Sequence, residues 1–143
     1  MGTISAGEGN TGHVNAGVLS PIIWRILSAL ALLAMGGIHL FLVFDGVGGL
    51  LGVLFVLNAI GGLLLAIAML VAPRRLLPVA SVLSLLFMVG TLLALVLALT
   101  VGLFGITETL DFTLVPTTLV VESIGTVVLL VTTALAFRAR RHS

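Results

Sequence analysis

Four long apolar stretches, separated by three short polar connections, dominate this sequence of 143 residues. A helix needs about 20 mostly apolar residues to cross the hydrocarbon core of a bilayer, and each stretch is at least that long. Charged residues make up 8% of the chain and apolar residues 60%, so there are too few charges to cover a water-soluble domain. The sequence therefore predicts an integral membrane protein that contacts the lipid bilayer.

Turn signals in the connections set the limits of the spans. Ser20 and Pro21 can open the first span as a capping hydroxyl and a residue without an amide hydrogen, and Pro73 can end the second. The predicted spans are residues 21–44, 47–72, 76–104 and 114–137. Short connections make neighbouring helices antiparallel, which predicts an all-α, up-down-up-down four-helix bundle in the membrane. The stretches lack the alternation of apolar and polar residues that a membrane β-barrel requires.

The two ends of the chain differ from the spans in composition. Residues 1–20 are rich in Gly, Thr, Asn and Ser, and we expect them to form a disordered polar leader. Residues 138–143 contain three arginines and read as a basic tail. With four spans, both ends fall on the same side of the membrane.

The charged residues predict an orientation. Every basic residue of the chain is an arginine, and with four spans every arginine falls on one side. Glu108 and Asp111 fall on the other side, and Asp45 lies at that edge. By the positive-inside rule the arginine side is cytoplasmic, so both termini are expected in the cytoplasm. The residues that carry this prediction are Arg25, Arg74, Arg75, Arg138, Arg140 and Arg141.

Polar side chains inside the spans are candidates for a ligand or proton site, because lipid excludes them unless they serve a purpose. They are His39, Asn58 and Glu122, with Asp45 at the membrane edge. His39 and Glu122 differ in depth by only about 4–5 Å. We therefore expect them within hydrogen-bonding or one-water distance if the first and last helices are neighbours, with Asn58 extending the network. A purely structural role, or the docking of a partner, is the alternative.

Glycines at helical spacing predict close packing between helices. Gly48 and Gly52 form a GxxxG spacing that could dock a helix of this chain or of another. The full set of packing candidates is Gly48, Gly52, Gly61, Gly62 and Gly125.

The sequence lacks the residues that most catalytic mechanisms require. The chain has no cysteine, and of its three histidines only His39 lies in a span. His39 with Met35 could contact a soft metal, or could hold haem with Met69 or Met88, but methionine more often fills gaps in apolar helices. The sequence contains no nucleophile elbow, no metalloprotease pair and no phosphate-binding loop. We expect no catalytic residue, no metal and no cofactor, and no nucleic-acid partner, because topology accounts for the arginines.

Two functions fit these observations. The first is a non-catalytic accessory or scaffolding subunit of a larger membrane complex or of a homo-oligomer. The alternative is a small permease or a proton- or ion-conducting element that uses Glu122 and His39. The small size of the chain favours the first.

One pair of motifs carries a resemblance. Gly37-Ile38-His39-Leu40, followed by Gly-Val-Leu-Phe-Val-Leu-Asn at residues 52–58, resembles a pattern in small four-span bacterial membrane proteins that have no assigned reaction. The resemblance covers the first two spans. It implies the bacterial cytoplasmic (inner) membrane, and it makes His39 and Asn58 motif positions without giving either a catalytic role.

Overall fold

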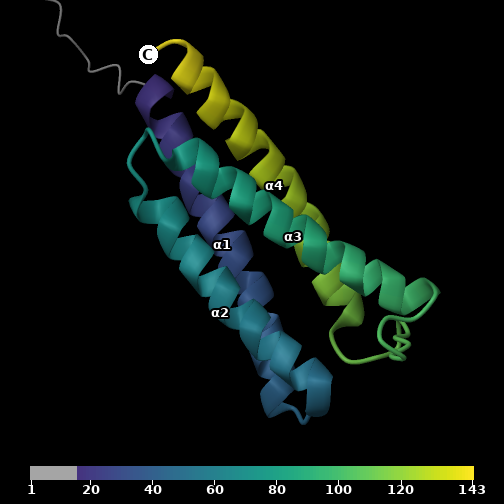
Figure 1. Cartoon of the computed structure of the whole chain (residues 1–143). Coiled ribbons are helices and arrows are strands. Elements are labelled where there is room, and N and C mark those ends of the chain that lie inside the picture. Colours follow the sequence, from purple (N-terminus) through teal and green to yellow (C-terminus); the bar gives the residue numbers. More distant parts are fainter. Residues whose placement is uncertain (1–15) are drawn as a thin grey trace, which may run out of the picture.

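The chain folds into four helices joined by three connections (Figure 1). The computed structural model describes residues 16–143. The helices are α1 (Ala16–Phe44), α2 (Gly49–Val71), α3 (Leu77–Thr100) and α4 (Val115–Arg141). All four are long and apolar enough to cross a membrane. The predicted all-α four-helix fold is confirmed, and the chain is a multi-pass membrane protein whose outer surface contacts the bilayer.

Three helix ends differ from the sequence prediction. α1 begins at Ala16, so residues 16–20 of the expected leader are helical, while residues 1–15 lie outside the described part of the chain. α3 ends at Thr100 because Gly102 adopts a φ of +83° and turns the chain. α4 continues through the basic tail to Arg141, where cationic side chains complement the negative end of the helix dipole.

The helices pack as two hairpins, α1–α2 and α3–α4, and the hairpins contact each other mainly through α1 and α4. α1 packs against α2 and α4, α4 packs against α3, and α2 touches α3 at few positions. Figure 1 shows the α1–α2 pair and the α3–α4 pair close together near the C-terminus and diverging toward the opposite end. The buried apolar core joins the four helices through Ala29, Leu32, Met35, Ala66, Met69, Ala80, Met88 and Leu129.

Charges separate between the two ends of the bundle. The start of α1, the α2–α3 turn and the end of α4 share one end, which carries all the arginines (Figure 1). The α1–α2 turn and the α3–α4 connection share the other end, with Asp45, Glu108 and Asp111. We call these the arginine end and the acidic end.

Arg25 also has a structural task that its charge alone did not reveal. Its Nε donates to the carbonyl of Met69 at 2.7 Å, and its Nη2 donates to Leu70 at 3.0 Å and to Ala72 at 2.7 Å. The last carbonyls of a helix have no partner within the helix, so the guanidinium supplies the missing donors at the end of α2.

The glycines predicted for packing lie in different environments. A Cβ on Gly62 would meet the backbone oxygen of Leu32 at 3.0 Å, so α1 and α2 approach closely there. A Cβ on Gly61 or Gly125 would meet the side chains of Phe87 and Met88, both on α3, at 2.7 Å. At Gly52 it would meet the carbonyl of Val47 at 2.7 Å, and at Gly48 it would meet no described atom within 4 Å. The GxxxG pair thus closes its own turn and contacts no other helix of the described chain.

Candidate functional site

The divergence of the two hairpins leaves an apolar cavity at the acidic end, which we call the wedge cavity. Its volume is about 550 Å³, within the range of about 300–1,000 Å³ that is typical of ligand sites. All four helices and the α3–α4 connection contribute to its wall. The lining residues fall within 39–42 of α1, 51–58 of α2, 86–98 of α3, 103–112 of the connection and 115–118 of α4.

The wedge cavity reaches the outer surface between α2 and α3. Leu57 of α2 and Leu86 of α3 both line it, and their side chains are 58% and 63% exposed. These helices touch at few positions, one of them being the ring of Phe87 over Gly61. Since both helices cross the membrane, this opening faces lipid rather than water.

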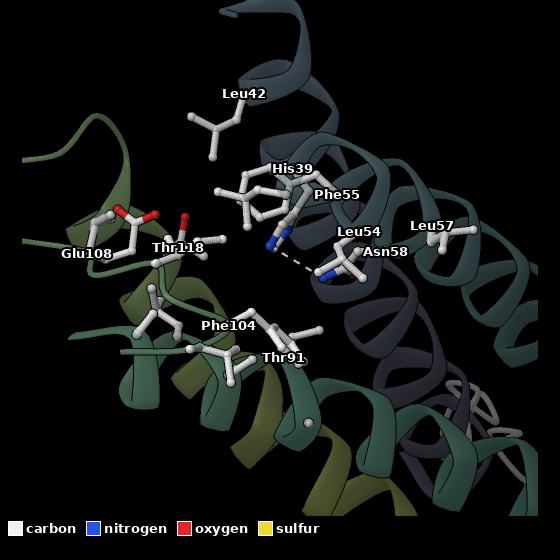
Figure 2. A pocket seen from close by; sticks show the side chains of 18 of the residues that line it. His39, Leu42, Leu54, Phe55, Leu57, Asn58, Thr91, Phe104, Glu108 and Thr118 are labelled. Carbon is white, nitrogen blue, oxygen red and sulfur yellow. Dashed lines mark hydrogen bonds between the residues drawn. The ribbon is translucent and has the colours of Figure 1, made fainter. Parts of the chain in front are cut away.

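His39 and Asn58 form one polar element of the wall (Figure 2). The Nδ1 of His39 lies 2.8 Å from the carbonyl of Met35, and its Nε2 lies 3.4 Å from Nδ2 of Asn58. A carbonyl only accepts and an amide NH₂ only donates, so these contacts fit the neutral tautomer that carries its hydrogen on Nδ1. Phe55 packs edge-on against the imidazole, with ring centroids 4.7 Å apart. The imidazole is therefore held on three sides.

Two threonines supply oxygen to the cavity wall. Thr91 Oγ1 donates to the carbonyl of Met88 at 2.9 Å, and it also lies 3.2 Å from Sδ of Met35. Thr118 Oγ1 donates to the carbonyl of Leu114 at 2.7 Å. A hydroxyl has one hydrogen, which both side chains give to atoms of the protein, so both retain lone pairs that can accept.

The α3–α4 connection (residues 101–114) covers one side of the wedge cavity. Leu103 and Ile106 exchange two backbone hydrogen bonds of 2.8 Å, which closes a tight turn with a φ of +51° at Phe104 and +76° at Gly105. Phe104 adopts a left-handed conformation that bulky residues rarely take, and its side chain lines the cavity.

Glu108 is the charged residue of this cover. Its amide donates to the carbonyl of Ala98 at 3.0 Å, which ties the connection back to α3, and its side chain lines the wedge cavity. Glu108 and Thr118 both line the wedge cavity, and Figure 2 shows both to the left of His39 and Asn58. Partial burial raises the pKa of Glu108 above its ordinary value. Sequence reasoning used this residue only for orientation, because a single acid in a polar connection has no spacing that predicts a cavity.

The expected hydrogen bond between His39 and Glu122 is not formed. α1 and α4 are neighbours, but both ring nitrogens of His39 have other partners. Glu122 is fully buried, and neither of its carboxyl oxygens has a partner in good hydrogen-bonding geometry among the described residues. The Thr91 hydroxyl is near this carboxyl, but its hydrogen points to the Met88 carbonyl. The prediction rested on depth along the two helices, but contact also depends on rotation about each helix axis. Asn58, not Glu122, is the partner of His39.

The wedge cavity ends inside the membrane. Its lining residues nearest the arginine end are Leu86 and Phe87, in the first half of α3. Toward the arginine end the bundle is packed with the fully buried Leu32, Met69 and Leu129, and with buried hydroxyl side chains such as Ser28 and Thr132, whose oxygens lie 2.8 Å apart. Glu122 does not line the cavity, although Thr118 one turn away does, and Asp45 lies exposed in the α1–α2 turn outside it. The site is thus a blind cavity open to lipid.

Among the described residues, no three His, Cys, Asp or Glu side chains meet at one point. The soft-metal alternative also needs a free imidazole nitrogen, and both nitrogens of His39 are engaged. The remaining polar groups of the wall suit hydrogen bonding to an organic molecule.

Comparison with known proteins yields no match: no family model fits the chain, and no curated protein or solved structure is significantly similar to it.

Proposed function

We propose that this chain is a non-catalytic accessory protein of the bacterial cytoplasmic membrane that holds an amphiphilic small molecule in the wedge cavity. The observation that carries the proposal is the blind cavity of about 550 Å³, lined mainly by apolar side chains and open between α2 and α3. Apolar walls with a few placed polar groups are the usual construction of a small-molecule site. Because the opening faces lipid, the ligand enters from the bilayer.

Filling the cavity tests this proposal. Gly90 lines the cavity, and a Cβ there would meet no described atom within 4 Å, so Gly90→Phe places a ring in the open space. Gly37 is equally free of close contacts but lies outside the wedge cavity, which makes Gly37→Phe the matched control. Mass spectrometry of solvent extracts from the purified proteins measures the bound ligand. We expect an amphiphile with the wild type and Gly37→Phe, and its loss from Gly90→Phe. Equal extracts from all three proteins would contradict the proposal.

The accessory role concerns what the chain assembles with. Large apolar side chains are exposed along every helix, and a partner subunit or a second copy can cover such surfaces as well as lipid can. We propose that a larger membrane subunit, or the chain itself, does so in the cell. Cross-linking in intact membranes followed by identification of the products tests this. Recovery of an uncross-linked single chain would argue against the accessory role and would leave ligand binding untouched.

The proposed orientation places the arginine end in the cytoplasm. It is supported by the gathering of all six arginines at one end of the bundle. Because the chain has no cysteine, Thr107→Cys and Ser143→Cys provide single labelling sites at the two ends. A membrane-impermeant maleimide added to intact cells should label the first and spare the second. The reverse pattern would invert the orientation.

One observation favours the alternative of a proton- or ion-conducting element, namely the buried Glu122 whose carboxyl oxygens have no partner within the described chain. Conduction needs a polar route through the whole bundle, and the buried apolar side chains of Leu32, Met69 and Leu129 argue against one. The buried hydroxyl groups nearer the arginine end, among them the Ser28–Thr132 pair, form no hydrogen bond with His39 or Glu122 within the described chain. His39 and Glu122 also have no shared hydrogen bond through which a proton could pass.

A further inference from the structure

The polar groups that line the wedge cavity leave mostly hydrogen-bond acceptors free. Thr91 and Thr118 give their hydroxyl hydrogens to the protein, to the carbonyls of Met88 and Leu114. Their free lone pairs accept, and an ionised carboxylate such as that of Glu108 only accepts. His39 gives its Nδ1 hydrogen to Met35, and Asn58 gives one of its two Nδ2 hydrogens to His39. Oδ1 of Asn58 is buried without a partner in the described chain, so it can accept as well. A ligand that matches this wall must bring donors of its own.

The charges around the cavity also favour a ligand that carries hydrogen-bond donors. Glu108 is the one acidic or basic side chain, apart from the neutral His39, among the described lining residues. Asp45 and Asp111 lie at the same end of the bundle, whereas every arginine is at the other end. The field at the cavity therefore favours a cation over an anion.

Resting on the function proposed above, we infer that the wedge cavity selects amphiphiles with an ammonium head and an apolar body. The ammonium donates to the Glu108 carboxylate at the side formed by the α3–α4 connection, and Thr118 lines the same cavity as a further acceptor (Figure 2). The apolar body lies along Leu54, Leu86 and Phe87 toward the opening between α2 and α3. An ammonium of this kind occurs on free lipophilic amines and on ethanolamine-type lipid heads, and the chemistry at Glu108 is the same for both.

The test compares three probes that share one chain length: decylammonium, decanol and decanoate. Native mass spectrometry of the detergent-solubilised protein reports the number of probes bound over a concentration series. We expect decylammonium to bind about fivefold more tightly than decanol, as one partly exposed charge pair would give, and decanoate to bind most weakly. A short-chain phosphatidylethanolamine in a separate arm distinguishes a lipid source from a free amine, since binding of either supports the inference.

Two carboxylate variants give the assignment to Glu108 a control. Glu108→Gln keeps the side-chain shape without the charge, and it should bring decylammonium and decanol to equal affinity. Asp111→Asn removes an exposed charge of the same connection that does not line the cavity, and it should leave the preference for decylammonium within twofold of the wild type. Helical circular dichroism and a single gel-filtration peak establish that each variant is folded.

The outcomes separate the inference from the function on which it rests. If decanol and decylammonium bind equally to the wild type, and Gly90→Phe abolishes both, the cavity binds amphiphiles but the ammonium preference is wrong. The same holds if Glu108→Gln retains the preference. If no probe binds in a manner that Gly90→Phe abolishes, the proposed function fails as well.

Discussion

Nδ2 of Asn58 lies 3.4 Å from Nε2 of His39, which joins the first half of α2 to the last turns of α1 inside the membrane. Nδ1 of the same imidazole is held by the carbonyl of Met35 at 2.8 Å. The two motif positions are thus joined in the wall of the wedge cavity, where Oδ1 of Asn58 has no partner in the described chain. These hydrogen bonds hold the two side chains in fixed positions in the cavity wall, and a ligand would contact that preformed wall.

Removing one member of this pair should cost more than removing both. We predict that Asn58→Leu lowers the free energy of unfolding by about 1 kcal/mol, since it leaves a buried ring nitrogen without a partner. The double variant Asn58→Leu with His39→Leu should lose less than the sum of the two single variants, because it leaves no orphaned group. Unfolding of the four proteins in mixed micelles by titration with SDS measures the coupling. Additive losses would mean that the contact contributes nothing.

Arg25 should stabilise the fold through its hydrogen bonds, apart from its effect on topology. Arg25→Lys keeps the positive charge but loses the planar guanidinium that reaches three carbonyls, so we predict a loss of about 1–2 kcal/mol in the free energy of unfolding. Arg74→Lys makes the same chemical change at an exposed residue of the α2–α3 turn and should change stability by less than about 0.5 kcal/mol. Equal effects in the two variants would show that Arg25 acts by charge alone.

The close approach of α1 to α2 at Gly62 should not tolerate a side chain. Gly62→Val drives methyl groups against the Leu32 carbonyl, where a Cβ alone would already lie at 3.0 Å, and we predict a loss of about 1–3 kcal/mol. Gly37→Val introduces the same side chain at an exposed helical position, where a Cβ would meet no described atom within 4 Å. Thermal unfolding of both variants in one detergent compares them. A Gly62→Val protein as stable as Gly37→Val would mean that the helices can separate without cost.

The sequence predicted the four helices because hydropathy is a local property that needs no knowledge of packing. The short connections also predicted antiparallel neighbours, and the condition that α1 and α4 pack together is met. It could not predict the partner of His39, since Asn58 and Glu122 both lie at compatible depths and only the rotation of each helix separates them. The wedge cavity was equally hidden, because it arises from the angle between two hairpins. Glu108 and Thr118 contribute to it from a connection and from a first helical turn, where no periodic pattern marks them.

Glu108 should make the stability of the protein depend on pH. Burial raises the pKa of Glu108, so the protonated acid is favoured more in the folded protein than in the unfolded chain. Its contribution to stability is complete below the ordinary pKa of a glutamate and is lost as the pH rises through the raised value. We therefore predict that Glu108→Gln is more stable than the wild type at about pH 8 and that the difference shrinks toward about pH 4. Thermal unfolding at both pH values, without added amphiphile, measures it, and a gap that widens toward acid pH would contradict the assignment.

Substitution of Glu122 distinguishes a structural role of the protein from a proton-conducting role. Its two carboxyl oxygens are buried without a partner in the described chain, and its neighbours at the α3–α4 interface include Met88 and Gly125. Replacing an unsatisfied buried polar group by an apolar one of similar size removes its desolvation cost. If Glu122 has no task in transport, Glu122→Met should raise the free energy of unfolding by about 1 kcal/mol and leave cavity binding unchanged, because Glu122 does not line the cavity.

Proton flux into liposomes that contain the purified protein completes the test of Glu122. We expect the wild type and Glu122→Met to leak protons at the rate of empty liposomes, because Leu32, Met69 and Leu129 fill the half of the bundle between the cavity and the arginine end. A flux that the wild type supports and Glu122→Met abolishes would instead require a conformation in which this apolar layer separates. Ala29→Leu, which adds bulk to the same buried cluster, would then reduce the flux as well.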